Sequence, residues 1–448
     1  MPINTHKKRA WVVAVNMGYG HERAASPFSD IAEGGIIIAN NYPGIPAADR
    51  RKWESSRWFY ELVSRAGQLP LVGAAIFNFY DREFQQIEPF YPKRDLSAPS
   101  FQLRQMFRLI RKGWGKNLID FVNRDPSLPF LTSFFLPAFM AEAHGYRGEI
   151  YCILCDADIS RTWAPLHPGK TRINYLAPNS RVVERLKLYG VPAKNIHLTG
   201  FPLPDGNIGG TDLGVLKKDL WHRIHHLDPS HNFINKYQDS LVHYLGAEVD
   251  GHCSKQCRLT LTFAVGGAGS QRELGGQIIK NLKSQILKDQ LRVNLVAGVR
   301  HDVYDYFRRE IKKIGLEGRF GKNLKIIFDL NKPGYFDKFN AVLRTTDVLW
   351  TKPSELVFYA GLGLPIVMAP PIGSQEQFNR HYLEAIGAGL DQGDSAYIAE
   401  WLFDWHRSGW LAEAAFQGFL DAPKFGAYKI KQLIFHRHQQ VEGHVELL

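Results

Sequence analysis

The sequence lacks several features that would place the protein across a membrane, outside the cell or among disordered chains. It has no low-complexity tract and no run of about 18 uncharged apolar residues, the length that a membrane-spanning helix needs. The first nine residues are polar and lead directly into an apolar segment, without the apolar region of a signal peptide. Only four cysteines occur in 448 residues, which favours a reducing compartment. We therefore expect a cytoplasmic protein.

What the sequence contains is typical of a globular protein with more than one domain. Hydrophobic residues make up 45% of the chain and charged residues 22%. The length allows two or three domains, each with a core of its own. The formal net charge of +11 indicates an anionic partner, such as a phosphate ligand, a membrane surface or a nucleic acid. Because no nucleic-acid recognition motif is present, we do not expect a nucleic-acid partner.

Apolar strand-like segments alternate with helix-like segments along two long stretches of the chain. The predicted strands of the first stretch are residues 11–15, 36–39, 130–134, 150–154, 174–176 and 196–199, and its predicted helices are residues 50–66, 101–122, 137–144 and 180–189. The predicted strands of the second stretch are residues 259–265, 292–297, 324–328, 348–350 and 364–368, and its predicted helices are residues 272–287, 303–314 and 336–344, with only helices after residue 375. This alternation predicts an α/β fold of two Rossmann-like domains that face each other across a cleft.

The alternation also predicts where the domains begin and end. We place an N-terminal Rossmann-like domain at residues 1–205 and a second one at residues 258–395. Between them, residues 206–257 form a predicted connector with a polar, histidine-rich helix over residues 213–245. The remaining residues, 396–448, are predicted to form helices that pack back across both domains.

A glycine turn follows the first predicted strand of each domain. The residues of these turns that could contact a ligand are Gly18 and Gly20 in the first, and Gly267, Gly269 and Ser270 in the second. Glycine lets the backbone approach a phosphate, and the N-terminus of the following helix stabilises its charge by about 0.3–2 kcal/mol. The alternative is a tight strand–helix turn without a ligand. The first turn does not complete the dinucleotide-binding motif, so a nicotinamide cofactor is not indicated.

The segment from Asp347 to Asn379 is typical of a ligand-binding corner. A predicted strand ends in polar residues, a helix-start signal follows with serine as its predicted N-cap, and a second strand leads into a proline- and glycine-containing loop. Ligands bind at the carboxyl ends of the strands in such a crossover. The candidate binding residues are Thr351, Lys352, Ser354, Glu355, Gln375, Glu376 and Asn379.

His21 is the candidate catalytic residue because it directly follows the first glycine turn, where a side chain would face the cleft. An imidazole with a reference pKa near 6.5 suits a general base that deprotonates an acceptor hydroxyl. The alternative is a histidine that caps the following helix or packs against it. No nucleophile elbow or Walker lysine motif occurs.

Two patterns could hold a metal ion, but neither is well placed for it. Asp156 and Asp158 resemble an acidic motif of some sugar transferases, but we expect them at the end of a strand, away from the phosphate turns. The four cysteines could supply four thiolates, but Cys152 and Cys155 lie on a predicted strand, where residues three apart face opposite sides. We therefore expect no metal ion and no cofactor.

Basic and aromatic residues gather in two segments of the first domain, residues 50–59 and 104–114. Basic side chains attract anionic lipid and tryptophan suits the membrane interface, so these segments could form a membrane-facing surface. The alternative is a set of core aromatic residues with a solvated basic rim. We expect Trp401, Trp405 and Trp410 to lie in the core, and the histidines of the connector on a solvated helix face.

Taken in order, these motifs resemble those of the GT-B glycosyltransferases, in particular the monogalactosyldiacylglycerol synthase type. The lipid II-forming N-acetylglucosaminyltransferase is a more distant likeness. The resemblance covers nearly the whole chain outside the connector. The matching motifs are Gly18–His21, Cys155-Asp156 through Trp163, Asn174–Pro178, Gly190–Pro192, Gly200–Pro202, Gly266–Gly269, Thr351–Pro353, and Ser374–Glu376 with Asn379.

The resemblance implies a hexosyltransferase that moves a sugar from a UDP-sugar to a hydroxyl acceptor, lipids included, by an inverting, metal-independent mechanism. The first domain would then bind the acceptor and the second the nucleotide sugar, with the protein peripheral on the inner face of the membrane. The implied roles are the base for His21, diphosphate binding for Gly267, Gly269 and Ser270, added positive charge for Lys352 or Arg300, ribose binding for Glu355, and sugar binding for Gln375, Glu376 and Asn379.

The chain departs from the family pattern at two places. Ser354 and Glu355 replace a glycine pair in a shortened segment, and Ser160 and Arg161 stand where the family has a histidine. Two other readings therefore stay open. One is a nucleotide-sugar epimerase or hydrolase of the same fold, and the other is a non-catalytic module that binds a sugar nucleotide or a membrane surface.

Overall fold

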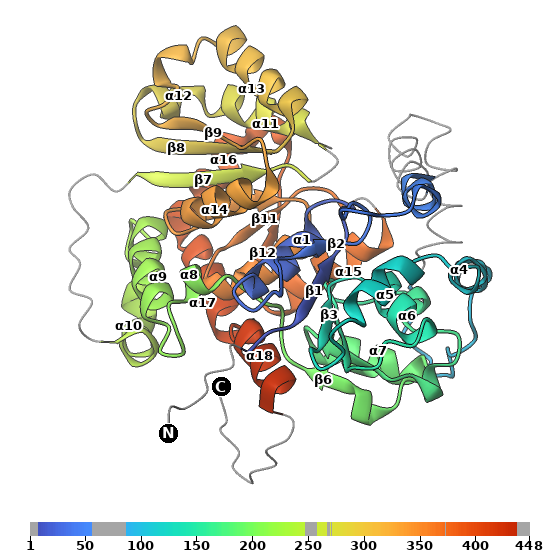
Figure 1. Ribbon diagram of the computed structural model, residues 1–448. Coiled ribbons are helices and arrows are strands. Elements are labelled where there is room, and N and C mark those ends of the chain that lie inside the picture. Colours follow the sequence, from blue (N-terminus) through green and yellow to red (C-terminus); the bar gives the residue numbers. More distant parts are fainter. Residues whose placement is uncertain are drawn as a thin grey trace, which may run out of the picture.

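The fold consists of two parallel β-sheets of six strands each, surrounded by helices (Figure 1). A computed structural model describes residues 8–55, 87–246, 258–266, 269, 271–371 and 373–436. The strand order is β2-β1-β3-β4-β5-β6 in the first sheet and β12-β11-β10-β7-β8-β9 in the second, and the strands that pair are parallel throughout. The predicted α/β fold with two doubly wound sheets is thus confirmed.

The first half of the molecule, residues 8–204, is built around the first sheet. Its strands are β1 (Trp11–Ala14), β2 (Ile37–Ile38), β3 (Phe130–Thr132), β4 (Ile150–Ile153), β5 (Ile173–Ala177) and β6 (Ile196–Leu198). Its main helices are α1 (Gly20–Ala25), α4 (Phe101–Arg111), α5 (Lys116–Val122), α6 (Phe135–Ala143) and α7 (Ser180–Leu188). The central strands are continuous apolar runs because helices cover both faces of a parallel sheet.

The second half, residues 205–436, is built around the second sheet. Its strands are β7 (Leu259–Ala264), β8 (Leu291–Gly298), β9 (Leu324–Phe328), β10 (Val348–Thr351), β11 (Ile366–Met368) and β12 (Gly389–Asp391). The helices of this sheet are α11 (Arg272–Asn281), α12 (Lys283–Leu287), α13 (His301–Ile314), α14 (Lys332–Leu343), the 3₁₀ helix η7 (Glu355–Leu362) and α15 (Ser374–Ala385). The strand β12 was not predicted, because its three residues carry only one large apolar side chain.

Among the described residues, six further helices lie outside the two sheets. They are α8 (Asp205–Ile208), α9 (Gly214–Leu227), α10 (Asn232–Leu245), α16 (Ile398–Ser408), α17 (Trp410–Asp421) and α18 (Gly426–His436). The buried Arg223 of α9 fixes this helix to the second half by donating hydrogen bonds to the carbonyl groups of Thr346, Leu343 and Leu362. The last helix, α18, returns to the first half, where Lys431 pairs with Asp30 at 2.8 Å. The predicted domain boundaries stay a prediction.

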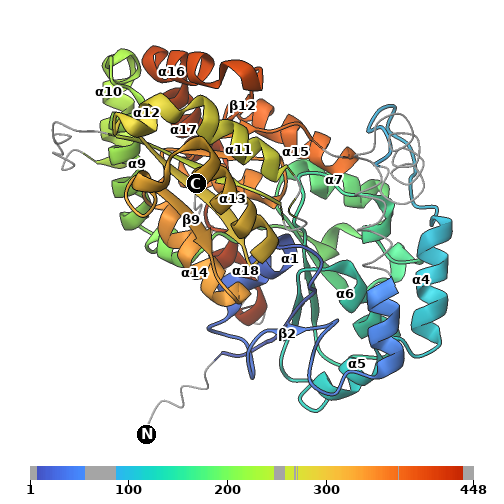
Figure 2. The same ribbon diagram turned by 90° about the horizontal axis from the view of Figure 1, so that it is seen from above.

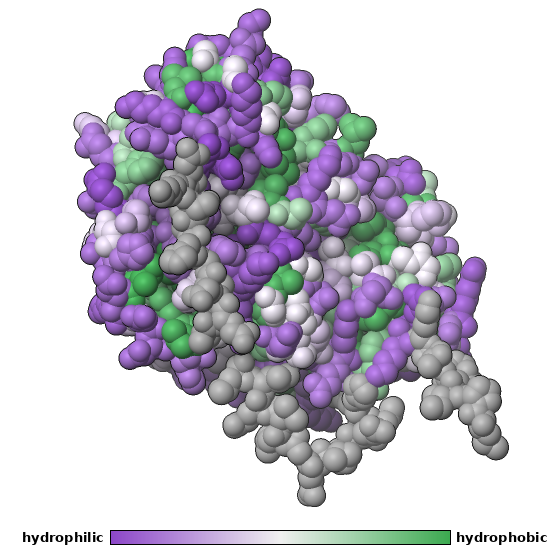
Figure 3. Space-filling model, turned by 90° about the vertical axis from the view of Figure 1, so that its left-hand side faces the viewer, coloured by the Kyte–Doolittle hydropathy of each residue, from purple (hydrophilic) through white to green (hydrophobic). Residues whose placement is uncertain are grey.

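Two hydrophobic cores hold these layers together. One fills the space between the first sheet and α4–α7, and it includes Cys152. The other contains the opposite face of the first sheet, with Cys155, and continues through the second half. The two cysteines therefore lie on opposite faces, as the strand period requires. On the side of the molecule that carries α9 and α10, the visible surface is mainly hydrophilic and its hydrophobic areas are small and separate (Figure 3).

Three predicted helices are each broken into two. The predicted helix 101–122 stops at Gly113 and Gly115, whose φ angles of +94° and +84° are left-handed. The predicted helix 213–245 ends near Asp228, whose carboxylate instead accepts hydrogen bonds from the first backbone N–H groups of α10. The predicted helix 272–287 becomes α11 and α12, which meet at Leu282.

Other sequence-based expectations are wrong or fall outside the described residues. Trp410 was expected in the core but its side chain is 55% exposed. Ser354 occupies the predicted N-cap position of η7, but its side chain makes no capping hydrogen bond within the described structure. Among the described helices, none is both long and apolar enough to cross a membrane. The remainder of the predicted helix 50–66 beyond residue 55, Cys253 and Cys257 lie outside the described residues.

Candidate functional site

The carboxyl ends of strands from both sheets meet at a cleft of about 330 Å³. In each sheet the glycine turn lies where the chain direction of the crossovers changes, after β1 in the first sheet and after β7 in the second. Such switch points are where open α/β sheets bind ligands. Of the predicted site residues, those that line this cleft are Gly18, Gly20, His21, Arg300, Thr351, Lys352, Ser354, Glu355, Gln375, Glu376 and Asn379.

His21 stands at the switch point of the first sheet, and the end of β3 fixes its ring. Its Nδ1 lies 2.9 Å from the carbonyl oxygen of Ser133, and the Ser133 hydroxyl donates to the carbonyl oxygen of His21 at 2.6 Å. Because a carbonyl oxygen only accepts, Nδ1 carries the proton and Nε2 presents a lone pair. Burial lowers the pKa of His21 to about 4, against the Ser133 hydrogen bond, so the ring is neutral at pH 7.

Aromatic side chains form a wall beside His21. The ring centre of Phe134 lies 4.6 Å from that of His21, and the ring centre of Trp163 lies 6.2 Å from it. Phe135 extends this wall, with its ring centre 5.1 Å from that of Trp163. The ring of His21 therefore has apolar neighbours in the first half.

The backbone geometry requires glycine at position 18, and position 20 lies close to the second half. Gly18 has a φ of +87°, a backbone conformation that residues with a Cβ rarely adopt. A Cβ on Gly20 would lie 3.2 Å from Oε2 of Glu355, so the first turn of α1 touches the second half directly. Lys332, at the start of α14, donates to Oδ1 of Asn16 at 2.7 Å and pairs with Glu22, which holds this turn in place.

The second glycine turn lies beneath two basic side chains. A Cβ on Gly266 would be 2.5 Å from Cε of Lys352, and a Cβ on Gly269 would be 2.9 Å from Nε of Arg300. The backbone N–H of Gly269 donates to the carbonyl of Gly266 at 2.8 Å, which closes the turn. Such a turn covered by cations suits an anionic ligand. Gly267 and Ser270 lie outside the described residues, so their roles stay a prediction.

The polar residues after β10 divide into structural and ligand-facing groups. The buried hydroxyl of Thr351 donates to the carbonyl of Ala264 at 3.2 Å, which joins β10 to β7. Lys352 forms an ion pair with Glu376 of α15, and both side chains line the cleft. Gln375 lines the same wall. Lys352, Gln375 and Glu376 are thus placed to contact a ligand bound at the strand ends.

Asn379 lines the cleft, and contacts within the protein occupy its amide. It is fully buried, its Oδ1 accepts from the N–H of Ala157 at 2.7 Å, and its Nδ2 donates to Oδ1 of Asp156 and to the carbonyl of Pro353, both at 3.2 Å. The bonds with Ala157 and Asp156 join the two halves of the molecule, and the bond to Pro353 lies within the second half. The sugar-binding role of Asn379 stays a prediction.

Asp156 was expected away from the phosphate turns, and this expectation is wrong. Its carboxyl group lines the cleft near Lys352 and Glu376. Burial raises its pKa to about 6, while the hydrogen bond from Asn379 lowers it, so Asp156 carries a proton in part of the molecules near neutral pH. Asp158 is instead buried against Arg185 at 2.8 Å. Within the described parts of the chain, no group of three or more His, Cys, Asp or Glu side chains could hold a metal ion.

Several cleft residues could not be found from the sequence. Two residues of the first half, Arg23 and Tyr19, contact the second half across the cleft. Two residues of the second half, Lys332 and Tyr335, contact the first half. For example, the hydroxyl of Tyr19 accepts from the backbone N–H of Val299 at 3.0 Å, over a separation of 280 residues. No local pattern indicates such a partner. The sequence carries a single signal for these cleft residues, which is that Arg23 lies only two residues from His21.

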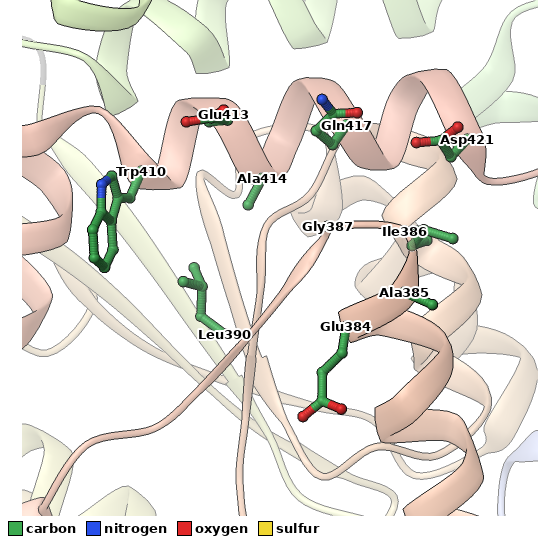
Figure 4. A pocket seen from close by; sticks show the side chains of 10 residues that line it. All are labelled: Glu384, Ala385, Ile386, Gly387, Leu390, Trp410, Glu413, Ala414, Gln417 and Asp421. Atoms are coloured by element: carbon green, nitrogen blue, oxygen red, sulfur yellow. The ribbon is translucent and has the colours of Figure 1, made fainter.

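A second hollow, of about 490 Å³, lies between α15 and α17 (Figure 4). Trp410, Glu413 and Asp421 of α17 line this hollow on one side, and Glu384 of α15 lines it on the other. It contains none of the predicted site residues and neither glycine turn. We therefore place the functional site in the cleft between the two sheets.

Comparison with known proteins gives distant similarities. No family model matches the chain. It is 20% identical over 327 residues to a processive diacylglycerol beta-glucosyltransferase of Bacillus subtilis (strain 168), an alignment that spans 72% of each chain. It is 24% identical over 259 residues to the protein of the same description from Bacillus cytotoxicus, over 57% of this chain and about half (53%) of that protein.

Solved structures with a similar arrangement have TM-scores near 0.4. A UDP complex of MnaA from S. aureus has a TM-score of 0.42 at 11% identity and covers 84% of this chain and 88% of its own. MurG from Acinetobacter baumannii has a TM-score of 0.41 at 13% identity, and the alignment covers 84% of this chain and 95% of MurG. Anabaena HepE with UDP-glucose has a TM-score of 0.41 at 13% identity, and the alignment covers 74% of this chain and 84% of HepE.

Proposed function

We propose that this chain, which resembles the GT-B glycosyltransferases, transfers a sugar from a UDP-sugar to the hydroxyl group of an acceptor. The transfer inverts the anomeric carbon and uses no metal ion. One observation carries the proposal. The cleft pairs a neutral histidine, whose Nε2 is ready to accept a proton, with a glycine turn covered by Lys352 and Arg300. The sequence similarity to two glucosyltransferases agrees with it.

The second half stabilises the leaving group. When the bond between the sugar and the diphosphate breaks, negative charge develops on the diphosphate oxygen. The backbone of Gly266 and Gly269 and the side chains of Lys352 and Arg300 lie where they can stabilise this charge. Glu355 accepts hydrogen bonds from the ribose hydroxyls, and Gln375 and Glu376 bind the hydroxyls of the sugar.

The first half activates the acceptor. Nε2 of His21 takes the proton of the acceptor hydroxyl as its oxygen attacks the anomeric carbon. The base and the diphosphate-binding turn belong to opposite halves of the molecule, so the attack comes from the face opposite the leaving group and the configuration inverts. The rings of Phe134 and Phe135, which are partly exposed and pack against the buried Trp163, offer an apolar surface to the acceptor next to the base.

A lipid acceptor is supported by the outer surface of the first half. The helix α4 lies at the edge of this half (Figure 2), with Leu103 and Ile110 buried and Phe101 76% exposed. Its exposed basic side chains are Arg104, Arg108, Arg111 and Lys112. Cations attract anionic lipid, and an apolar side chain can enter the interface. We include a peripheral membrane position in the proposal on this ground.

A donor and acceptor matrix tests the proposed function. UDP-, GDP- and dTDP-sugars are each incubated with the protein, with and without vesicles that contain diacylglycerol, and the released nucleotide and the glycosylated lipid are measured. We expect UDP release that depends on the lipid and yields a glycolipid. Epimerised sugar without a lipid product would favour the epimerase. Donor binding without turnover for every acceptor would favour a non-catalytic module.

A further inference from the structure

Arg23 belongs to α1, two residues after His21, but its side chain extends into the second half of the molecule. It is 3% exposed. Its guanidinium carbon lies 4.7 Å from the ring centre of Phe339, 5.1 Å from that of Phe336 and 5.6 Å from that of Tyr335. Attraction between the cation and these aromatic faces offsets part of the cost of burying the charge.

The guanidinium also has two polar partners in the second half. Nη2 donates to the hydroxyl of Tyr335 at 3.0 Å, and Nε donates to Oε1 of Glu355 at 3.3 Å. The Glu355 side chain is 14% exposed, so this ion pair is largely shielded from water. A buried charge is costly without an opposite charge, and Arg23 and Glu355 therefore stabilise each other in this arrangement.

Gly20 restricts Glu355 from the other side. A Cβ at this position would lie 3.2 Å from Oε2 and 3.3 Å from Cδ of Glu355, so the carboxylate rests on the first turn of α1. A carboxylate has about four acceptor positions, and the contact with Arg23 uses one of them. Glu355 also lines the cleft. Its orientation there is thus set by two residues of the first half.

We propose that Arg23 is a positioning residue for the nucleotide: from the first half of the chain, it holds the Glu355 carboxylate in the orientation that accepts hydrogen bonds from the ribose hydroxyls. This inference rests on the proposed function, because it takes Glu355 as the ribose-binding group. Its consequence is that the donor side of the cleft is complete only when the first half has closed on it. A residue that merely joined the two halves would not affect recognition of the ribose.

The binding of two nucleotides, UDP and 2′,3′-dideoxy-UDP, separates these roles. Calorimetry of the full chain gives both dissociation constants for the wild type, Arg23→Met, Arg23→Lys and Glu355→Gln. We expect the wild type to bind UDP about tenfold more tightly than the dideoxy analogue, since hydrogen bonds to a charged group are strong. In Arg23→Met, and in Glu355→Gln, this ratio should fall towards one. Methionine keeps an apolar stem among the aromatic rings but cannot hold the carboxylate.

The other variants keep the test decisive. Lysine retains the charge but cannot reach Tyr335 and Glu355 together, so the ratio of the two dissociation constants in Arg23→Lys should lie between those of the wild type and Arg23→Met. Arg23→Lys also replaces Arg23→Met if that variant does not fold. Lys431→Gln is the matched control, because it removes a different ion pair between the halves and should leave the ratio unchanged.

Each contrary outcome has its own meaning. If Arg23→Met weakens both nucleotides by the same factor, Arg23 only joins the halves and the inference is overturned. If the wild type binds UDP but does not distinguish the two nucleotides, Glu355 does not bind the ribose and the inference also fails. If the wild type does not bind UDP at all, the proposed function itself fails.

Discussion

At the scale of single residues, His21 shows how two backbone segments determine the chemistry of one side chain. The Ser133 carbonyl, at the end of β3, fixes the proton on Nδ1, and burial keeps the ring neutral. The sequence indicated this residue because a strand, a glycine turn and a histidine follow each other directly. It did not indicate Ser133, which is 112 residues away and becomes a neighbour only through the pairing of β1 with β3.

The first prediction concerns this base. Replacing His21 by Ala should lower the rate of transfer about 100-fold or more, while UDP binds as before, because the residue lies on the acceptor side. In the wild type the pKa of His21 is lowered to about 4, so the neutral base persists as the pH falls below 6.5 and is lost only near pH 4. We expect an acid limb of kcat/KM for the acceptor near that value. An acid limb near pH 6.5 that disappears in His21→Ala would contradict the buried position of the base.

The residues that the sequence did not reveal have a common physical reason. Arg23 and Glu355 are 332 positions apart, and their pairing depends on how the two halves pack. Asp156 could be placed at the end of a strand, but its closeness to Lys352 comes from the second sheet. A local motif in the sequence indicates the residues that a turn presents. It does not indicate the contacts that arise only when the two halves of the molecule meet.

At the scale of secondary-structure elements, the apolar strands were predicted well, and the ends of the helices less well. A buried strand of a parallel sheet is a continuous apolar run, which is visible in the sequence. The helix breaks depend on finer features. Gly113 and Gly115 end the predicted helix 101–122 by adopting left-handed φ angles, and Asp228 begins α10 by capping its first N–H groups. Glycines and an aspartate inside helical patterns are the sequence signals of these helix ends.

The second prediction concerns α4 as a membrane-facing helix. Replacing Arg104, Arg108 and Lys112 by Gln should weaken binding to vesicles with anionic lipid more than 10-fold, since each basic residue near such a surface contributes about 1 kcal/mol. Flotation at low and high salt measures this, and high salt should weaken the wild type as well. The matched control removes three exposed cations of α13 in the second half, Arg309, Lys312 and Lys313. Equal losses in both triple variants would show that net charge, and not α4, attracts the lipid.

At the scale of the whole molecule, the two halves complete each other's side of the cleft. Lys332 of the second half holds the turn that carries His21, and Arg23 of the first half holds Glu355. Asn379 joins the loop after β4 to the carbonyl of Pro353, next to Lys352. The segment from Asp347 to Asn379, which the sequence singled out as a ligand corner, therefore also contacts the first half, through Glu355 and Asn379.

The last prediction tests that contact through Asn379. Replacing it by Ala removes three hydrogen bonds and leaves the buried N–H of Ala157 without its acceptor, a cost of about 1–3 kcal/mol. Because two of these bonds, those with Ala157 and Asp156, exist only when the halves are together, we expect a larger radius of gyration in X-ray scattering and a raised KM for both donor and acceptor. The matched control is Asn207→Ala, which removes the hydrogen bond that the side-chain amide of the buried Asn207 donates to the carbonyl of Asn340 within the second half. It should lower stability without opening the cleft. If Asn379→Ala raises only the KM of the donor and scattering is unchanged, the amide instead contacts the sugar directly, as its motif first indicated.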